Sequence, residues 1–384
     1  MSSWGTEFMK HANVAIFVPH NGCPHQCSFC DQKSITGQAA QPSPEDVRAA
    51  AERARETLGP GCGAELAFFG GSFTAVEPAY MVSLLEAARP YVESGLFSGI
   101  RISTRPDCVG EDVLSLLWGY GVRSIELGAQ SMREDVLRLN RRGHTARDVE
   151  EASVRIQERG FSLGLQMMTG LYGDDAEGAR YTARKLAELR PDTVRIYPTV
   201  VMRGTELGRL YQKGAYIPPG LEETVPLCAE LLGFFEDRGI RVIRLGLHDT
   251  PELRRDMLAG AYHPALGELC ESRLFLDRLL SAAESRCPAA AEAVRVAVNP
   301  KMVSKALGQK RRNLQALKEA GFRVEFLQDD SVPTGEFRIL ASFSQEEEKE
   351  TADRNNTAAG GSKRKVERYE AEITGNTGIQ DLSR

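Results

Sequence analysis

Three cysteines near the start of the chain carry the clearest chemical signal in the sequence. Cys23, Cys27 and Cys30 are separated by three and then two residues, and no further cysteine follows until Cys62. Iron–sulfur clusters are held by cysteine thiolates, normally four, which often come from one tightly spaced run. Three cysteines with this spacing predict a four-iron cluster in which one iron has no protein ligand. Chemistry on a bound small molecule would take place at that open iron.

A zinc site is the first alternative, because zinc also binds thiolates. Structural zinc needs four ligands in a tetrahedral array, usually from two separated Cys or His pairs. His25 can supply a fourth ligand, but three cysteines and a histidine within eight residues would form a cramped chelate. A disulfide framework is disfavoured, because we expect no signal peptide and eight cysteines in 384 residues is ordinary usage for a reducing cytoplasm. The other cysteines are interpreted mainly as core residues: Cys62, Cys108, Cys228, Cys270 and Cys287.

The composition is that of a globular enzyme. Hydrophobic residues make up 42% of the chain and charged residues 26%, which suits one large domain with a smaller appendage. The net charge of -5 argues against a uniformly basic nucleic-acid-binding coat. No stretch approaches the 18 or more apolar residues of a membrane span, so we expect a cytoplasmic protein with no membrane partner.

Short β-rich runs alternate with amphipathic helical stretches, which is typical of a parallel sheet with crossover helices. Ser43 before Pro44 is a good helix start. The predicted strands are 13–18, 65–69, 100–104, 124–127, 161–167 and 193–197, and the predicted helices are 44–58, 77–93, 111–120, 146–159 and 176–189. Six strand–helix units predict an α/β fold, a partial (β/α)6 barrel of the TIM type.

The unusual residues of the chain fall in the loops that follow the predicted strands. Active-site residues of such barrels come from the loops at the carboxyl ends of the strands. The cysteine run follows the first strand, and the later loops contain residues 70–74, 105–107, 128–131, 197–199 and 203–205. Each motif alone is weak, since a Gly-Gly pair is often a turn and Arg-Pro-Asp is often a capped helix start. On one rim they predict a single site.

These motifs together carry a resemblance to a known family. The cysteine run resembles that of radical S-adenosylmethionine (SAM) enzymes, and about three fifths of the chain, from Val14 to Asp249, resembles the radical SAM domain of the Elongator catalytic subunit. Oxygen-independent coproporphyrinogen dehydrogenases are similar over the first half only. The segments that carry the resemblance are Phe69 to Phe73, Ile102 to Asp107, Ile125 to Ser131, Arg142 to Thr145, Tyr197 to Thr199 and Arg203 to Thr205.

The resemblance implies a cofactor pair and a reaction. A [4Fe–4S] cluster would be held by Cys23, Cys27 and Cys30, and the methionine end of SAM would chelate the fourth iron. One electron, from a donor such as flavodoxin or ferredoxin, would cleave the sulfonium C–S bond and give a 5′-deoxyadenosyl radical that abstracts a substrate hydrogen. The protein would supply position, electrostatics and exclusion of water and oxygen. No catalytic residue can be named from the sequence.

The resemblance also implies residues that bind SAM near the cysteine run and the second strand. Phe29 matches the aromatic residue that packs on adenine, although it can also be a structural aromatic. Gly70 and Gly71, with Ser72, match the turn that binds the methionine group. Absence of Cβ at a glycine lets backbone groups approach a ligand closely.

Four further residues match positions that contact the cofactor. Ser103 stands where relatives often carry a Glu, so its hydroxyl can hydrogen-bond a ribose but brings no charge. Arg105 is always charged and its planar fork suits a carboxylate such as that of SAM. Gln130 and Arg142 match cofactor-contacting positions, and either can instead be a surface residue.

The second part of the chain differs from the Elongator subunit. That subunit joins the radical SAM domain to a lysine-acetyltransferase-like lobe, which supplies an acetyl group for carboxymethylating wobble uridine in tRNA. Nothing after Asp249 resembles the glycine-rich pyrophosphate loop that such a lobe places before a helix. We expect the radical machinery to be kept and the acyl-donor lobe to be missing.

The sequence divides into three predicted parts. Residues 1–249 form the barrel, and residues 250–342 form a helical linker and a small α/β module. Residues 343–384 form a disordered tail, because their charge runs and few large apolar residues cannot offset the ordering entropy.

The small module is predicted to be basic. Residues 295–323 contain eight Lys or Arg and a single acid, Glu319, for a local charge of +7. A strand (293–298), a helix (300–307), a turn (308–311), a helix (312–319), Gly321 as C-cap and a strand (323–327) are predicted in that order. This order is similar to a KH module, which clamps RNA with a GXXG loop, although Arg311 replaces the second glycine here. The alternative is a small dimerisation or lid domain with a solvated basic face.

We interpret the chain as a cytoplasmic radical SAM enzyme of the Elongator-like branch that abstracts hydrogen from tRNA or another structured RNA. Lys310, Arg311 and Arg312 are predicted to contact the RNA phosphates. Two alternatives stay open: radical modification of a small metabolite or peptide, and a non-catalytic iron–sulfur protein that binds RNA or transfers electrons. The group transferred, any acyl-CoA co-substrate and the oligomeric state are not identified.

Overall fold

The computed structural model describes residues 13–19, 27–30, 40–58, 62–286 and 293–343. The chain divides into two compact units between Gly267 and Glu268, in the first turn of α11 (Leu266–Arg286). Cys23, Cys287 and the predicted tail from residue 344 onward lie outside the described residues. No described helix is both long and apolar enough to cross a bilayer.

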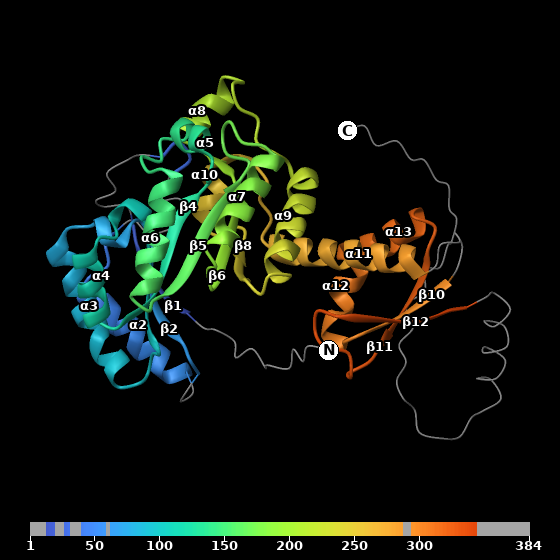
Figure 1. Cartoon of the computed structure of the whole chain (residues 1–384), viewed down its shortest axis with the longest axis horizontal. Helices are drawn as coiled ribbons and strands as arrows, with labels where there is room; N and C mark the ends of the chain where they lie inside the picture. Colours follow the sequence, from blue (N-terminus) through green and yellow to red (C-terminus); the bar gives the residue numbers. More distant parts are fainter. Residues whose placement is uncertain (1–12, 20–26, 31–39, 59–61, 287–292, 344–384) are drawn as a thin grey trace. The chain divides into compact units, whose positions relative to one another are not determined.

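The first unit contains a seven-stranded, all-parallel sheet in the order β1-β2-β3-β4-β5-β6-β8, which curls into a half-barrel (Figure 1). Its strands are β1 (Asn13–Val18), β2 (Glu65–Gly70), β3 (Gly99–Thr104), β4 (Val122–Gln130), β5 (Ser162–Thr169), β6 (Thr193–Pro198) and β8 (Arg241–Leu245). The predicted partial barrel is confirmed, with β8 as a seventh strand that we did not predict.

Helices connect successive strands, as a parallel sheet requires. They are α2 (Pro44–Thr57), α3 (Pro78–Glu93), α4 (Glu111–Gly119), α5 (Glu134–Leu139), α6 (Ala146–Glu158), α7 (Ala176–Glu188), α8 (Glu206–Gln212) and α9 (Leu221–Glu236). After β8, the last strand of the sheet, comes α10 (Pro251–Asp256). A separate short antiparallel pair forms between β7 (Val200–Met202) and β9 (Met257–Gly260). The predicted start of α2 is confirmed, because Ser43 and Asp46 form a capping box.

The two faces of the sheet differ in polarity. Along the central strands alternate residues are apolar and fully buried: Leu66, Phe68, Ile100, Ile102, Ile125, Leu127, Leu163 and Leu165. Because side chains alternate across a strand, these residues share the face on which α6 and α7 pack (Figure 1). The residues between them point to the other face, and many are polar or charged: Glu65, Arg101, Ser103, Glu126, Gln166 and Arg195.

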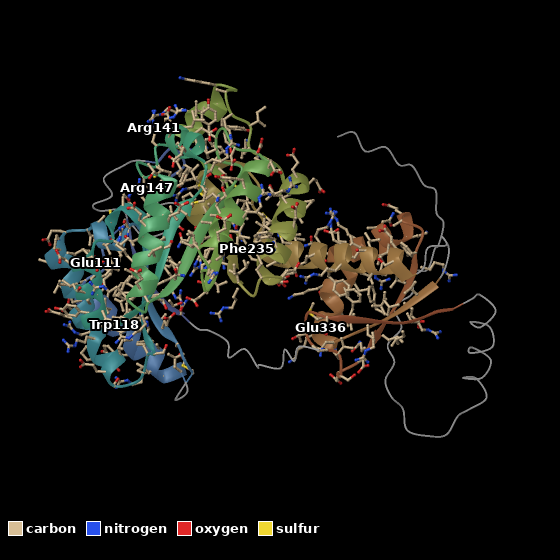
Figure 2. The ribbon with its side chains drawn as sticks, in the orientation of Figure 1. Glu111, Trp118, Arg141, Arg147, Phe235 and Glu336 are labelled. Carbon is tan, nitrogen blue, oxygen red and sulfur yellow. The ribbon has the colours of Figure 1, made fainter. Side chains whose placement is uncertain are left out.

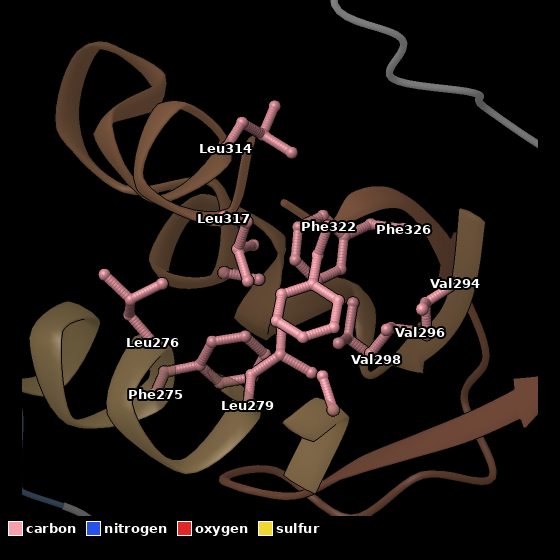
Figure 3. Packing of buried hydrophobic residues seen from close by; sticks show 12 residues of the cluster. Phe275, Leu276, Leu279, Val294, Val296, Val298, Leu314, Leu317, Phe322 and Phe326 are labelled. Carbon is pink, nitrogen blue, oxygen red and sulfur yellow. The ribbon is translucent and has the colours of Figure 1, made fainter. Parts of the chain in front are cut away.

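The second unit is a three-stranded sheet packed against helices. Its order is β11-β10-β12, with β10 (Ala293–Val298) parallel to β11 (Arg323–Gln328) and antiparallel to β12 (Phe337–Phe343). Between β10 and β11 lie α12 (Val303–Leu307) and α13 (Arg312–Glu319), in the predicted order. Residues of α11, α13, the sheet and the turn before β11 form the core (Figure 3): Phe275, Leu276, Leu279, Val294, Val296, Val298, Leu314, Leu317, Phe322 and Phe326.

The carboxylate of Glu126 ties four strands of the half-barrel together. It accepts hydrogen bonds from Nε and Nη2 of Arg195 at 2.6 and 2.9 Å, and from Nη1 of Arg101 at 3.2 Å. Nε2 of Gln166 donates to the same carboxylate at 2.9 Å. Arg101 continues the network to Glu65 on β2, with Nε 2.6 Å from the carboxylate. Two buried acids therefore balance two buried cations across β2, β3, β4 and β6.

Replacing Glu126 with Gln tests this network. The neutral amide keeps the shape but leaves two buried guanidinium groups with too little negative charge, so we expect the free energy of unfolding to fall by about 3–5 kcal/mol. Urea denaturation of the purified protein measures it. Glu230→Gln is the matched control, because its ion pair with Arg180 at 2.7 Å is on the surface and should contribute less than about 1 kcal/mol. Equal losses in the two variants would contradict the role of Glu126.

Candidate cofactor site

The described part of the cysteine run is fastened to loops from distant parts of the first unit. Cys27 is buried and Cys30 is half-buried, whereas Cys23 lies outside the described residues. The backbone N–H of Ser28 donates to the carbonyl of Asn140 at 3.1 Å, and its hydroxyl donates to Oδ1 of Asn140 at 2.7 Å. The N–H of Leu207, in the first turn of α8, donates to the carbonyl of Ser28 at 2.8 Å. Ser28, next to Cys27 in the described part of the run, is thus anchored to Asn140 and to the start of α8.

Asn140 is a positioning residue that the sequence analysis missed. Its side chain is fully buried, and Nδ2 donates to the carbonyls of Val136 and Tyr172 at 2.9 Å each. One amide therefore joins the end of α5, the loop after β5 and the cysteine run. A single Asn at a helix end gives no signal of such a long-range role in the sequence.

Arg142 connects the cysteine run to β4. Nη1 lies 3.1 Å from Sγ of Cys27, and Nη2 donates to the carbonyl of Gly128 at 2.6 Å. The residue is 6% exposed, and no carboxylate pairs with it within the described residues. A buried charge without a counter-ion is costly. The Cys27 sulfur lies beside this buried cation, at a place where an anionic metal ligand would be stabilised.

Arg105 supports this arrangement from β3. Its guanidinium makes a double hydrogen bond with Asp107, at 2.9 and 3.0 Å, and Nη2 also donates to the backbone carbonyl of Arg142 at 2.5 Å. The N–H of Arg105 donates to Oγ of Ser72 at 3.1 Å. Arg105 therefore fixes the Arg142 backbone and links it to the loop after β2.

The glycine turn after β2 follows the backbone of β1. Gly70 has a φ of +113°, and a Cβ there would lie 2.8 Å from the carbonyl oxygen of Val18. Gly71 donates its N–H to the same carbonyl at 2.9 Å. Glycine at position 70 is thus required by strand packing alone. The next residue, Ser72, is buried with its hydroxyl 2.8 Å from that of Thr104.

The other predicted residues lie in the cysteine run and near the ends of β3 and β4. Ser103 is half-buried, and its hydroxyl accepts a hydrogen bond from Gln166 at 2.8 Å. Phe29 is half-buried and packs against the cluster of Val201, Leu207 and Tyr216. Gln130 has a φ of +66°, and its Oε1 is buried with no hydrogen-bond partner within the described residues.

The end of β4 gathers buried polar atoms that no described residue satisfies. Besides Oε1 of Gln130 they include Nε of Arg142 and Nδ1 of His144. A Cβ on Gly128 would lie 2.9 Å from Nε2 of Gln130 and 3.4 Å from Nη2 of Arg142, so glycine makes room for both side chains. Buried polar groups are normally hydrogen-bonded. These unsatisfied atoms, together with the Cys27 sulfur 3.1 Å from the buried guanidinium of Arg142, fit a site for a cluster and a polar cofactor.

His144 is buried in its neutral form at this rim. Nε2 lies 3.2 Å from the carbonyl of Ala129, which assigns the ring proton to Nε2. Burial, and then the charges of Arg142 and Arg105, lower the pKa of His144 to about 3. The imidazole can therefore accept a hydrogen bond at Nδ1 throughout the physiological pH range.

The shifted pKa of His144 makes stability depend on pH. The unfolded chain takes up this proton near pH 6.5 whereas the folded chain does not, so unfolding becomes easier as the pH falls below that value. We expect the free energy of unfolding, measured by urea denaturation between pH 7 and pH 4.5, to fall with pH more steeply in the wild-type than in His144→Gln. The difference should be up to about 1.4 kcal/mol per pH unit. Parallel curves for the two proteins would contradict a neutral, buried imidazole.

Asp174→Asn is a control with the opposite sign. The Asp174 side chain is fully buried, and burial raises its pKa to about 6. The folded chain therefore binds this proton more readily than the unfolded chain, and wild-type stability gains from this group as the pH falls through 6. In Asp174→Asn the free energy of unfolding should lack this increase as the pH falls through 6.

Comparisons with known proteins identify the family. A model of the Radical SAM superfamily matches residues 17–186, and a model of the Radical_SAM C-terminal domain matches residues 191–275. The chain is 28% identical over 303 residues to tRNA uridine(34) acetyltransferase of Methanocaldococcus jannaschii, covering 67% of this chain and 54% of the relative. It is 34% identical over 179 residues to Elongator complex protein 3 of Dictyostelium discoideum, covering 46% of this chain and 31% of the relative.

A solved structure supports the same fold. The archaeal Methanocaldococcus infernus Elp3 with an N-terminal deletion has a TM-score of 0.56 and 24% sequence identity, and the match covers 72% of this chain and 64% of that one. The chain spans about half the length of the M. jannaschii relative. The two family models together cover roughly two thirds of the 384 residues. This chain therefore belongs to the radical SAM superfamily, whose cofactors are a [4Fe–4S] cluster and SAM, and it is an enzyme homologous to the proteins named Elongator complex protein 3 and tRNA uridine(34) acetyltransferase.

Proposed function

We propose that this protein is a tRNA-modifying radical SAM enzyme whose cluster is held by Cys23, Cys27 and Cys30. The observation that carries the cofactor assignment is the buried guanidinium of Arg142, 3.1 Å from Sγ of Cys27 and without an acidic partner in the described segments. That pairing puts a fixed positive charge beside the sulfur, where an anionic metal ligand would be stabilised.

SAM is proposed to lie between the cysteine run and the ends of β2 to β4. When bound, the cluster and SAM supply a 5′-deoxyadenosyl radical that abstracts hydrogen from the substrate. Oε1 of Gln130 and Nδ1 of His144 offer acceptors, and Nε of Arg142 offers a donor. The hydroxyl of Ser103 and the half-exposed ring of Phe29 add a polar and an apolar contact. The Gly70-Gly71-Ser72 turn completes the predicted set, with backbone groups close to β1.

In this proposal Arg105 does not bind the SAM carboxylate directly. Nε and Nη2 of Arg105 are already engaged by Asp107 and by the carbonyl of Arg142. We therefore assign Arg105 to holding Arg142 in place. The residues of the chain orient the cofactor, bury it away from water and provide fixed charge.

RNA is the proposed substrate, and the relatives that are named for tRNA uridine support it. In the second unit, Lys310 and Arg311 are exposed on the turn between α12 and α13, and no ion pair within the described residues neutralises them. Arg312 follows in the first turn of α13 and is also exposed. Phosphate contacts by such residues supply affinity that does not depend on sequence. The proposal includes a cytoplasmic location, where thiols stay reduced, and a small one-electron donor such as flavodoxin or ferredoxin.

Replacing Cys27 with Ala tests the cluster assignment. We expect the anaerobically reconstituted variant to lose its brown iron–sulfur absorbance and most of its iron, and to release no 5′-deoxyadenosine from SAM under reducing conditions, because two ligands cannot retain the cluster. Cys108→Ala is the matched control, since Cys108 is half-buried on the same rim and outside the run. Iron content equal to the wild-type in Cys27→Ala would refute the ligand role.

The RNA proposal is tested separately by changing Lys310, Arg311 and Arg312 together to Ala. We expect affinity for unmodified tRNA transcripts to fall, and the slope of log affinity against log salt to decrease by about 1 for each phosphate that the protein no longer neutralises. Cluster content and SAM cleavage without RNA should be unchanged. Arg184→Ala with Lys185→Ala is the control, because both cations lie on α7 and pair with acids. An unchanged salt slope in the triple variant would favour a lid or dimerisation role for this module.

A further inference from the structure

We propose that Arg142 sets the reduction potential of the cluster through its hydrogen bond to Cys27. This inference rests on the proposed function, because it takes Cys27 to be a cluster ligand. It goes further in naming the group of this chain that governs how easily the cluster accepts its electron. Nη1 of Arg142 lies 3.1 Å from Sγ of Cys27, so the guanidinium places a positive charge directly at the sulfur.

The sign of the effect follows from the charge. Hydrogen bonds to ligand sulfurs and burial are among the features that set iron–sulfur potentials. The one-electron step adds a single negative charge to the cluster, and no proton or leaving group moves. A fixed positive charge at the sulfur favours the reduced state, and it acts strongly here because Arg142 is 6% exposed. Arginine stays protonated at every accessible pH, so this charge is constant.

The guanidinium is also held rigidly. Nη2 donates to the carbonyl of Gly128 at 2.6 Å, and the backbone carbonyl of Arg142 accepts from Arg105 at 2.5 Å. The backbone N–H of Arg142 donates to the carbonyl of Leu137 at 3.0 Å. These three bonds aim Nη1 at the sulfur before any electron arrives. Asp107 neutralises Arg105 by a double hydrogen bond, so Arg142 is the uncompensated cation of the pair.

A purely structural role for Arg142 would predict a different result. In that case removing the side chain would loosen the loop and lower cluster content, while any cluster that assembled would keep its potential. Arg142→Gln removes the charge and keeps a donor, whereas Arg142→Lys keeps the charge and loses the fork. Arg141→Gln is the matched control in the same loop: the Arg141 side chain is 62% exposed and pairs with Glu206 at 3.7 Å (Figure 2).

The experiment is an anaerobic redox titration of the full-length, cluster-loaded protein without SAM or RNA. Titanium(III) citrate supplies the electrons, and electron paramagnetic resonance measures the reduced cluster. At the potential where the wild-type is half reduced, we expect the ratio of reduced to oxidised cluster to fall about tenfold in Arg142→Gln, equivalent to about 59 mV. In Arg142→Lys this ratio should fall less than about threefold. In Arg141→Gln it should match the wild-type ratio, because the charge at position 141 is exposed to solvent and screened.

Several outcomes would overturn the inference. If Arg142→Gln has the wild-type iron content and an unchanged reduction potential, the inference is wrong and the proposed function is unaffected. If neither Arg142→Gln nor Arg142→Lys assembles a cluster, the inference is also wrong, because Arg142 would then act in cluster assembly. If the wild-type itself binds no four-iron cluster, the proposed function fails first, and iron and sulfide analysis separates that case from the other two.

Discussion

The carboxylate of Glu126 is the interaction on which the arrangement of the half-barrel depends. It lies in the middle of β4 and receives donors from β3, β5 and β6, so the relative register of these strands is tied to one group. A polar network of this kind stabilises only when every member is satisfied, because unpaired charge in a low dielectric is costly. The strands that carry the network are therefore held with their carboxyl ends side by side. That alignment brings four separate loops to one rim.

Charge compensation differs between the barrel interior and that rim. Inside, Arg101 and Arg195 are matched by Glu65 and Glu126. At the rim, Arg142 is equally buried but contacts a cysteine sulfur and a backbone carbonyl. The fold thus pairs the cations that hold strands together with carboxylates, whereas the described partners of Arg142 at the rim are a sulfur and a backbone carbonyl. The network residues therefore serve the fold, and the rim residues are those to which the proposed function assigns the cofactors.

The sequence predicted the elements better than the contacts. Period-two apolar residues such as Ile100 and Ile102 identify buried strands directly, and the loops after them supplied most of the rim. By contrast, β8 carries Arg241 and Arg244 around a short apolar stretch, so it showed no clear strand pattern. Glu126 lay inside a correctly predicted strand, yet its partners come from other strands and leave no trace in local spacing. His144 and Asn140 were missed for the same reason, since their roles depend on carbonyls distant along the chain.

The turn between α12 and α13 places two cationic residues in a left-handed backbone conformation. Lys310 and Arg311 have φ values of +54° and +59°, a left-handed region that costs a side-chain-bearing residue about 1–2 kcal/mol. Nδ2 of the buried Asn313 offsets part of this cost by donating to the carbonyls of residues 305 and 306, at 3.1 and 3.2 Å. Glycine would adopt these angles without strain. Since stability alone would favour glycine at both positions, the two exposed cations are better explained by what their charge does outside the chain than by folding.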